Sequence, residues 1–130
     1  MSLTPERDSD ILTQTTCPLE LLEGRKDDGA KDPWHLAPWD AFRAIVMVLR
    51  FGANKYAPRN WERGMAWSRL FSATQRHLTA WWEGEKADPE TGMSHIWHAG
   101  CCVAFLIAFE IRGIGQDDRP IAGELEGRGL

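Results

Sequence analysis

The densest group of side chains able to do acid–base or metal chemistry lies between residues 76 and 98 of the 130-residue chain. It combines imidazoles, carboxylates and a guanidinium, namely Arg76, His77, Glu83, Glu85, Asp88, Glu90, His95 and His98. Carboxylates and imidazoles are ordinary protein ligands of divalent metals, and arginine binds phosphate. The group therefore predicts a site for a divalent cation, a phosphate, or both.

The histidines of this group have a helical spacing. His95 and His98 are three residues apart, so they share one face of a helix, and the stripe continues through Cys102 and Phe105. Two nitrogens on one face can bind a divalent metal or position a phosphate. His77 lies on the edge of its own apolar stripe and can face the same cavity. Each histidine alone would be read as a core residue, but the three together favour a functional site.

Several better-known motifs are excluded. Half of the zinc-protease motif is present, but Ile96 stands where the catalytic glutamate should follow His95. Cys101 and Cys102 are adjacent, so they point to different helix faces and cannot chelate one ion together. The sequence has no P-loop, no GxGxxG after a strand and no adjacent His-Asp pair. P-loop enzymes, dinucleotide-binding folds and HD-type phosphohydrolases are therefore disfavoured.

Three helices are predicted to position the site. Apolar residues at 42, 45, 46 and 49 predict a helix over residues 38–51. A second helix is expected from Ser68, as its N-cap, to about Glu83, and a third from Thr91 or Ser94 to about Arg112. Residues 53–64 and 84–93 hold glycine, proline and charged residues, which is typical of connections. Because the second and third helices form an antiparallel hairpin, the site residues converge at its closed end.

The predicted fold class is all-α, since no alternation with a period of two residues occurs. Residues 99–109 are apolar on every face, which three helices cover poorly, so we expect a bundle completed by another copy of the chain. Gly100, Ala104 and Ala108 would let two such helices approach closely. The alternative is that Leu19–Leu22 fold back over the helix. The predicted organisation is a polar arm at 1–30, a helical domain at 31–113 and a glycine-rich tail at 114–130.

Composition and charge limit the kinds of partner and the cellular compartment that we expect for this chain. A net charge of -4 and a pI near 5.5 disfavour a duplex nucleic-acid binder. Three cysteines and no N-terminal secretory pattern predict a reducing cytoplasm. The longest uncharged apolar run is shorter than the roughly 18 to 20 residues of a membrane span, so we expect a buried helix and no membrane.

Three strings carry a family resemblance: KDDGAKDPWHLAPWDAF, FGANKYAPRNWERGMAWSRL and RHLTAWWEGEKADPETGMSHIWHAGCC. Over residues 25–113 the chain resembles the phage and bacterial dATP/dGTP diphosphohydrolases, relatives of the MazG-like all-α pyrophosphohydrolases. The resemblance implies a MazG-like bundle of two or four chains in the host cytoplasm. It also implies hydrolysis of dATP or dGTP to the monophosphate and pyrophosphate with Mg²⁺, or Mn²⁺, in phage nucleotide metabolism.

One departure from the MazG pattern concerns the metal ligands. MazG-like enzymes carry EExxE on one helix and ExxD on the next, whereas this chain has no acid between His77 and Glu83 and has His95 and His98 where ExxD would fall. The ligand set therefore has to come from the residues of the closer family.

The resemblance implies four groups of site residues. The metal ligands are Glu85, Asp88, His95 and His98, and the catalytic residues are Glu85, Glu90 and His77. The residues expected to bind phosphate are Lys31, Lys55 and Arg76. Those expected to bind the base are Trp34, Tyr56, Asn60 and Trp61. Two choices stay open: whether Glu85 or Glu90 is the general base, and whether the imidazoles bind metal or phosphate. The alternative function is a metal-stabilised nucleotide-binding module without turnover.

Overall fold

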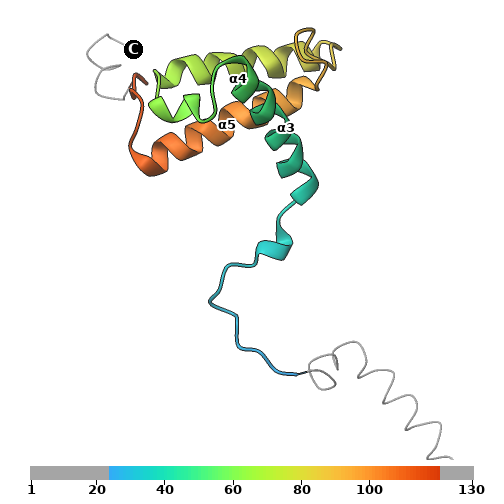
Figure 1. Ribbon diagram of the computed structural model, residues 1–130, viewed down its shortest axis with the longest axis vertical. Helices are drawn as coiled ribbons and strands as arrows, with labels where there is room; N and C mark the ends of the chain where they lie inside the picture. The colour runs from blue at the N-terminus through green and yellow to red at the C-terminus, as the bar shows by residue number, and fades with distance from the viewer. Residues whose placement is uncertain (1–23, 121–130) are drawn as a thin grey trace, which may run out of the picture. The chain divides into compact units, whose positions relative to one another are not determined.

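A computed structural model describes residues 24–120 (Figure 1). It contains the helices α3 (Trp39–Lys55), α4 (Trp67–Trp82) and α5 (His95–Arg112), and the short 3₁₀ helices η1 (Trp34–Leu36) and η2 (Asn60–Arg63). Across residues 24–120 only isolated bridges, and no strands, accompany the helices. The expected all-α fold is confirmed.

The chain divides into two units, residues 1–37 and 38–130. In the first, residues 24–37 are irregular apart from η1 and almost wholly exposed. The predicted arm at 1–30 and the Leu19–Leu22 cover over α5 fall mainly or wholly outside the described residues. The second unit holds α3, α4 and α5, with both α3 and α4 packed on α5.

Helix α3 is longer than the sequence predicts. It continues past Gly52 and ends at Lys55, four residues beyond the expected end. Gly52 has no atom near the position a Cβ would take, so it neither needs a special conformation nor stops the helix. The stop comes from Pro58, which disfavours helical backbone at Ala57. The extension matters because it carries Lys55 to the site.

Helix α4 is capped differently from the prediction. It begins at Trp67, its N-cap is Ala66, and no side chain of the N-cap residue takes part. The expected cap, Ser68, instead donates its backbone N–H to Asp118 Oδ1 at 2.9 Å and its hydroxyl to the same carboxylate. A carboxylate near a helix N-terminus satisfies free amides and suits the helix dipole. Asp118 therefore does the capping from fifty residues away.

Helix α5 starts and ends as predicted. The Ser94 hydroxyl accepts the N–H of Ile96 at 3.2 Å, and Gly113 ends the helix in the left-handed region, at φ 65°. Its buried residues are His95, Ala99, Cys101 and Phe109. Gly100, expected at an interface between two copies, faces the Ile45 side chain of α3 instead.

The face of α5 that points away from its buried residues is uncovered in a single chain. Val103, Ile107 and Ile111, spaced four apart, are 40%, 52% and 78% exposed. Within the described part of the chain, α5 is also the one helix whose length and mean hydropathy of 1.2 would suit a membrane span. Central helices of soluble bundles have the same length and composition. The expectation that α5 lies buried is thus met on one face only.

Candidate functional site

A cavity of about 630 Å³ gathers residues from α3, the connection that follows it, α4, the 84–93 loop and α5. We call it the acid–histidine pocket. It is lined by eight of the residues expected at the site: Lys55, Tyr56, Asn60, Trp61, His77, Asp88, Glu90 and His98. These residues come from four separate stretches of sequence, so their convergence is a product of the fold.

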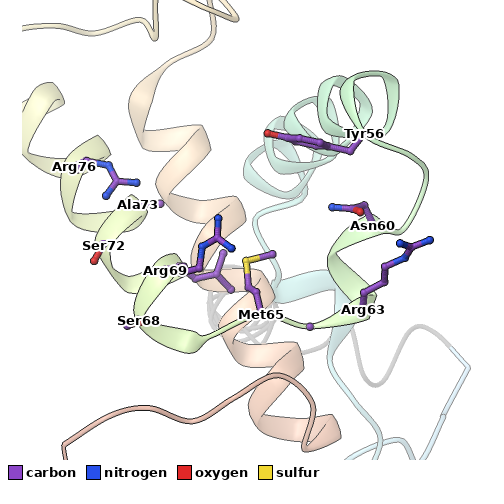
Figure 2. A pocket seen from close by; sticks show the side chains of 11 residues that line it. Tyr56, Asn60, Arg63, Met65, Ser68, Arg69, Ser72, Ala73 and Arg76 are labelled. Carbon is purple, nitrogen blue, oxygen red and sulfur yellow. The ribbon is translucent and has the colours of Figure 1, made fainter.

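A second cavity, of about 710 Å³, lies beside it and receives Arg76 (Figure 2). Here Arg76 is accompanied by Arg69 on the same helix and by Arg63 of η2. We call it the arginine pocket. The two cavities share part of their lining, including Tyr56 and Asn60. Arg76 thus lines the adjoining cavity, together with Tyr56 and Asn60 of the predicted site.

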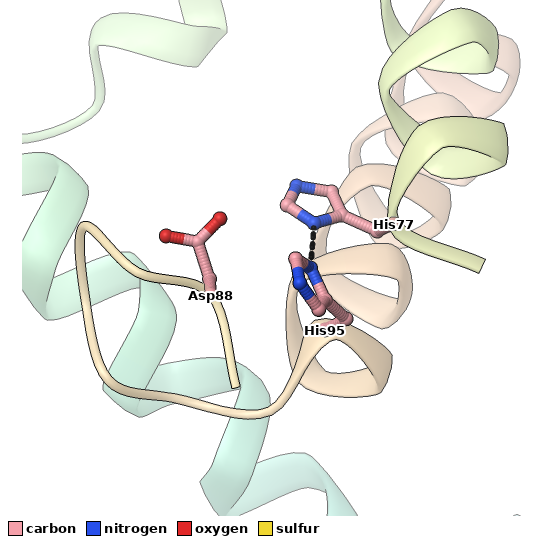
Figure 3. Close-up of side chains that lie close together, drawn as sticks. All are labelled: His77, Asp88 and His95. Atoms are coloured by element: carbon pink, nitrogen blue, oxygen red, sulfur yellow. Dashed lines mark hydrogen bonds between the residues drawn. The ribbon is translucent and has the colours of Figure 1, made fainter. Parts of the chain in front are cut away.

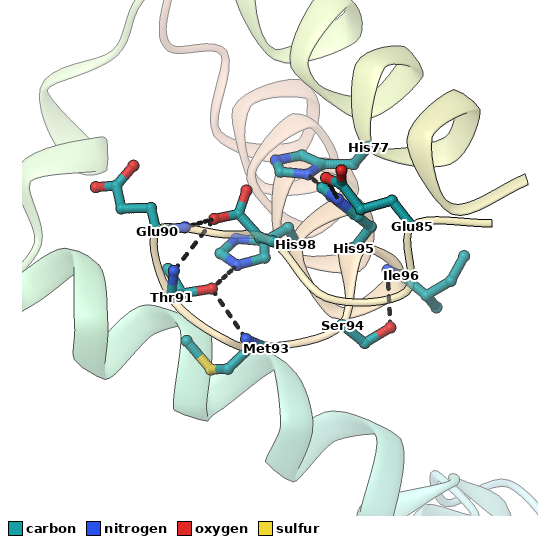
Figure 4. Close-up of polar contacts among 10 residues, drawn as sticks. His77, Glu85, Glu90, Thr91, Met93, Ser94, His95, Ile96 and His98 are labelled. Atoms are coloured by element: carbon teal, nitrogen blue, oxygen red, sulfur yellow. Dashed lines mark hydrogen bonds and ion pairs between the residues drawn. The ribbon is translucent and has the colours of Figure 1, made fainter. Parts of the chain in front are cut away.

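His95 links two other site residues. Its side chain is almost fully buried, and its Nδ1 lies 2.9 Å from His77 Nδ1 (Figure 3). Its Nε2 lies 2.7 Å from Glu85 Oε1 (Figure 4). A carboxylate on Nε2 favours a proton there, which leaves the Nδ1 lone pair directed at His77. Glu85 therefore contacts the site through His95, while its own carboxylate is half exposed.

Asp88 completes a group of three possible metal ligands. The ligand atoms of His77, Asp88 and His95 all lie within 4.8 Å of one another. Of the four expected metal ligands, this group includes Asp88 and His95, and it adds His77, which was expected to be catalytic. Glu85 and His98 lie outside it.

His98 lies next to this group, and Thr91 of the 84–93 loop holds its ring in place. Its ring stacks on that of His77, with centroids 4.8 Å apart, and its Nε2 lies 2.7 Å from Thr91 Oγ1 (Figure 4). Asp88 Oδ1 in turn accepts the N–H groups of Glu90, at 2.8 Å, and Thr91, at 3.2 Å. From the sequence, Thr91 is expected only as a possible start of α5. The Asp88–Thr91 spacing, typical of a side-chain-stabilised turn, is the signal that could have found it.

The imidazoles of His77 and His98 favour the neutral form. Burial lowers the pKa of His77, and the neighbouring His98 and His95 lower it further. Burial also lowers the pKa of His98, although Asp88 opposes the shift. A neutral imidazole offers the lone pair that metal binding requires.

The donor set bears on the identity of the ion. Two imidazole nitrogens and one carboxylate suit a first-row transition metal, among which Mn²⁺ accepts oxygen as well as nitrogen donors, whereas Mg²⁺ prefers oxygen ligands. The described residues therefore fit a divalent cation, with Mn²⁺ matching the nitrogen donors better than Mg²⁺.

Lys55 and Glu90 meet across the mouth of the acid–histidine pocket. Lys55 Nζ lies 2.5 Å from Glu90 Oε1, and this contact raises the pKa of Lys55. Both side chains are about half exposed, so the pair contributes little to stability and can exchange partners. An arriving phosphate would compete with Glu90 for the ammonium.

The aromatic side chains expected to bind the base differ in how much of each ring is already in contact with other side chains. The Trp61 ring stacks on Phe105, with centroids 4.9 Å apart, and Arg112 lies 5.0 Å from its centre. Tyr56 is 65% exposed at the pocket mouth. Tyr56 is the better platform for a base. Lys31 and Trp34 belong to the other unit of the chain and are not placed relative to this pocket.

Comparison with known proteins gives one family and one curated relative. The family described as "dATP/dGTP diphosphohydrolase, N-terminal" matches residues 22–119. A protein of Salmonella phage PMBT28 named "dATP/dGTP diphosphohydrolase" is 30% identical over 106 residues, which is 82% of this chain and 36% of the relative. The chain thus spans about a third of that relative's length. No solved structure matches the chain.

Proposed function

The chain belongs to the dATP/dGTP diphosphohydrolase family, and we propose from this premise that it hydrolyses dATP or dGTP to the deoxynucleoside monophosphate and pyrophosphate. The observation that carries the proposal is the acid–histidine pocket, where eight expected site residues from four stretches of sequence line one cavity. We place the activity in phage nucleotide metabolism, in the cytoplasm of the host.

The reaction requires compensation of charge. A nucleoside triphosphate carries about three to four negative charges, and its hydrolysis needs cations near the phosphate oxygens and a water positioned in line with phosphorus. Lys55 supplies one positive charge at the pocket mouth. The exposed Tyr56 ring next to it offers a face for the purine.

Glu90 is our choice for the residue that orients the water. It lines the pocket, whereas Glu85 is bonded to His95. A phosphate that takes Lys55 would free the Glu90 carboxylate to accept a proton from the water. The water oxygen would then bond to the α-phosphorus as the bond from that phosphorus to the bridging oxygen breaks.

A divalent metal is part of the proposal. His77, Asp88 and His95 would hold Mn²⁺, and Mg²⁺ would arrive on the oxygens of the triphosphate. Such ions neutralise charge on the phosphate oxygens during hydrolysis. Glu85 orients His95 for this purpose, as carboxylates do for histidines that bind metals.

The test is product identification. The purified chain is incubated with each of the four deoxynucleoside triphosphates and Mn²⁺ or Mg²⁺, and the products are separated by ion exchange. We expect dAMP or dGMP with an equal amount of pyrophosphate. Release of inorganic phosphate, or of intact tripolyphosphate with the deoxynucleoside, would mean that a different bond is cut.

The second candidate is a nucleotide-binding module without turnover. It is favoured by the chain's match to only about a third of its curated relative, since catalytic groups can lie elsewhere in a longer protein. Binding of dGTP without any product, in the same incubation, would select this candidate.

A further inference from the structure

The arginine pocket is a concentration of positive charge in which the sequence predicts a phosphate contact for Arg76 alone. Its guanidiniums come from Arg63, Arg69 and Arg76, and no carboxylate is among its lining residues. The chain as a whole has a net charge of -4, so a cavity lined by three cations, which the Asp118 carboxylate approaches only through its bonds to Ser68, departs from its average surface. Such a cavity attracts anions.

The geometry of α4 creates this pocket. Arg69 and Arg76 are seven residues apart, which places them on the same helix face about 10 Å apart along the axis. Ser72 and Ala73, the small residues between them, also line the cavity. Figure 2 shows Arg69 and Arg76 extending from α4 towards the space that Arg63 and Asn60 border on the other side.

The three guanidiniums have no acidic partner within residues 24–120. Other arginines there do, as in the pairs Arg112–Glu62 and Arg119–Asp117. Arginine forms bidentate hydrogen bonds with phosphate, so an unpaired cluster of this kind suits an anion with several phosphate groups.

The arginine pocket continues into the acid–histidine pocket. Tyr56, Asn60, Met65 and Leu70 line both cavities. Arg76 precedes His77 directly in sequence, and its charge helps to lower the pKa of that imidazole. An extended ligand can therefore reach the metal-ligand group and the guanidiniums together.

We propose that Arg63, Arg69 and Arg76 bind the β- and γ-phosphates of the substrate, the part that leaves as pyrophosphate. This inference rests on the proposed function. It divides the site into a base and α-phosphate region at the acid–histidine pocket and a leaving-group region at the arginine pocket.

Binding of inorganic pyrophosphate tests the assignment without turnover. Titration calorimetry of the full chain compares the wild type with Arg69→Gln and Arg63→Gln, both exposed positions where a polar replacement leaves the core intact. Arg43→Gln is the matched control, because Arg43 is an exposed arginine of α3 that lines neither cavity. We expect the dissociation constant for pyrophosphate to rise at least tenfold in each pocket variant and to change less than twofold in the control.

The outcomes separate this proposal from the proposed function. If pyrophosphate binds and depends on Arg69 while no triphosphate is hydrolysed, the pocket stands and the enzyme assignment fails. If triphosphate is hydrolysed but pyrophosphate binds Arg69→Gln as tightly as it binds the wild type, or does not bind at all, the pocket assignment is overturned. Tighter, Arg69-dependent binding of a single-stranded oligonucleotide than of pyrophosphate would also overturn it.

Discussion

His95 is held at both ends of its ring, by Glu85 at Nε2 and by His77 at Nδ1. The buried imidazole thus has a fixed orientation, while Glu85 stays half exposed and Asp88 is committed to the turn of the 84–93 loop. The sequence predicted that these residues meet, but not which atom faces which. Pairing of this kind depends on the rotation of α4 against α5, which residue spacing does not determine.

The Glu85 contact predicts a loss of metal affinity on substitution. Glu85→Ala should weaken Mn²⁺ binding about 10–100-fold, because His95 loses the partner that fixes its tautomer. Titration calorimetry with Mn²⁺ measures the change. Glu83→Ala serves as the control, since Glu83 is an exposed acid two residues away that lines neither cavity. Equal affinities for the two variants would contradict the role given to Glu85.

Cys101 should be chemically inert in the folded protein. Burial raises the pKa of its thiol to about 12, so at pH 8 the reactive thiolate is on the order of one part in 10⁴. In a Cys17→Ser, Cys102→Ser variant, a thiol reagent such as DTNB should label Cys101 only after denaturant is added. Rapid labelling of the native variant would show that the thiol is not buried.

The positions of the helices follow from the sequence more closely than the residues that end or cap them. The start and end of α5 follow from Ser94 and Gly113, local signals that the structure uses as expected. The end of α3 was predicted too early because Gly52 looked like a stop, and the cap of α4 was missed because Asp118 is distant in sequence. A capping partner that is distant in sequence, such as Asp118, does not alter the hydrophobic periodicity from which a helix is predicted.

The segment after α5 docks against the start of α4. Gln116 donates its N–H to the Met65 carbonyl, and Trp67 Nε1 donates to the Ile114 carbonyl. Gly115 lies between them at φ +79°, where a Cβ would come within 2.7 Å of the Met65 carbonyl oxygen. Only glycine fits there, so this part of the predicted tail is specified by close packing.

Two glycine variants test the docking. Gly113→Ala should cost about 1 kcal/mol of unfolding free energy, because it adopts left-handed backbone at φ +65° in open space. Gly115→Ala has the same backbone strain and adds a clash, so we expect a loss of about 3 kcal/mol. Urea denaturation midpoints compare them. Similar losses for both would mean that the docked segment is not closely packed.

A single chain leaves much apolar surface of α5 and α3 in water. Val103, Ile107 and Ile111 form an exposed stripe on α5, and Val46 on α3 is also 57% exposed. Burial of such surface is worth roughly 25 cal/mol per Å², so a second copy is the cover we expect. With Gly100 against Ile45, we place the interface on this exposed stripe rather than on the small residues of α5.

Self-association can be measured directly by light scattering at micromolar concentration. The wild type should have the mass of two or four chains, and Ile107→Glu should have the mass of one, because a charge would be buried at the interface. Gln75→Glu adds the same charge at an exposed position of α4 and should change nothing. A wild-type mass of one chain, or recovery of the protein with lipid vesicles, would show that the stripe is not an interface between copies of the chain.

The rate of dGMP release from dGTP by four proteins, assayed side by side with Mn²⁺, tests the assignment of the site most directly. His77→Ala and Asp88→Asn remove donors from the proposed metal group, while Gln75→Ala changes an exposed residue of α4 that lines neither cavity. We predict that the first two variants lose at least about 100-fold in rate, the order seen when groups acting on a transition state are removed, and that Gln75→Ala matches the wild type. Wild-type rates in folded His77→Ala and Asp88→Asn would contradict the assignment of the site.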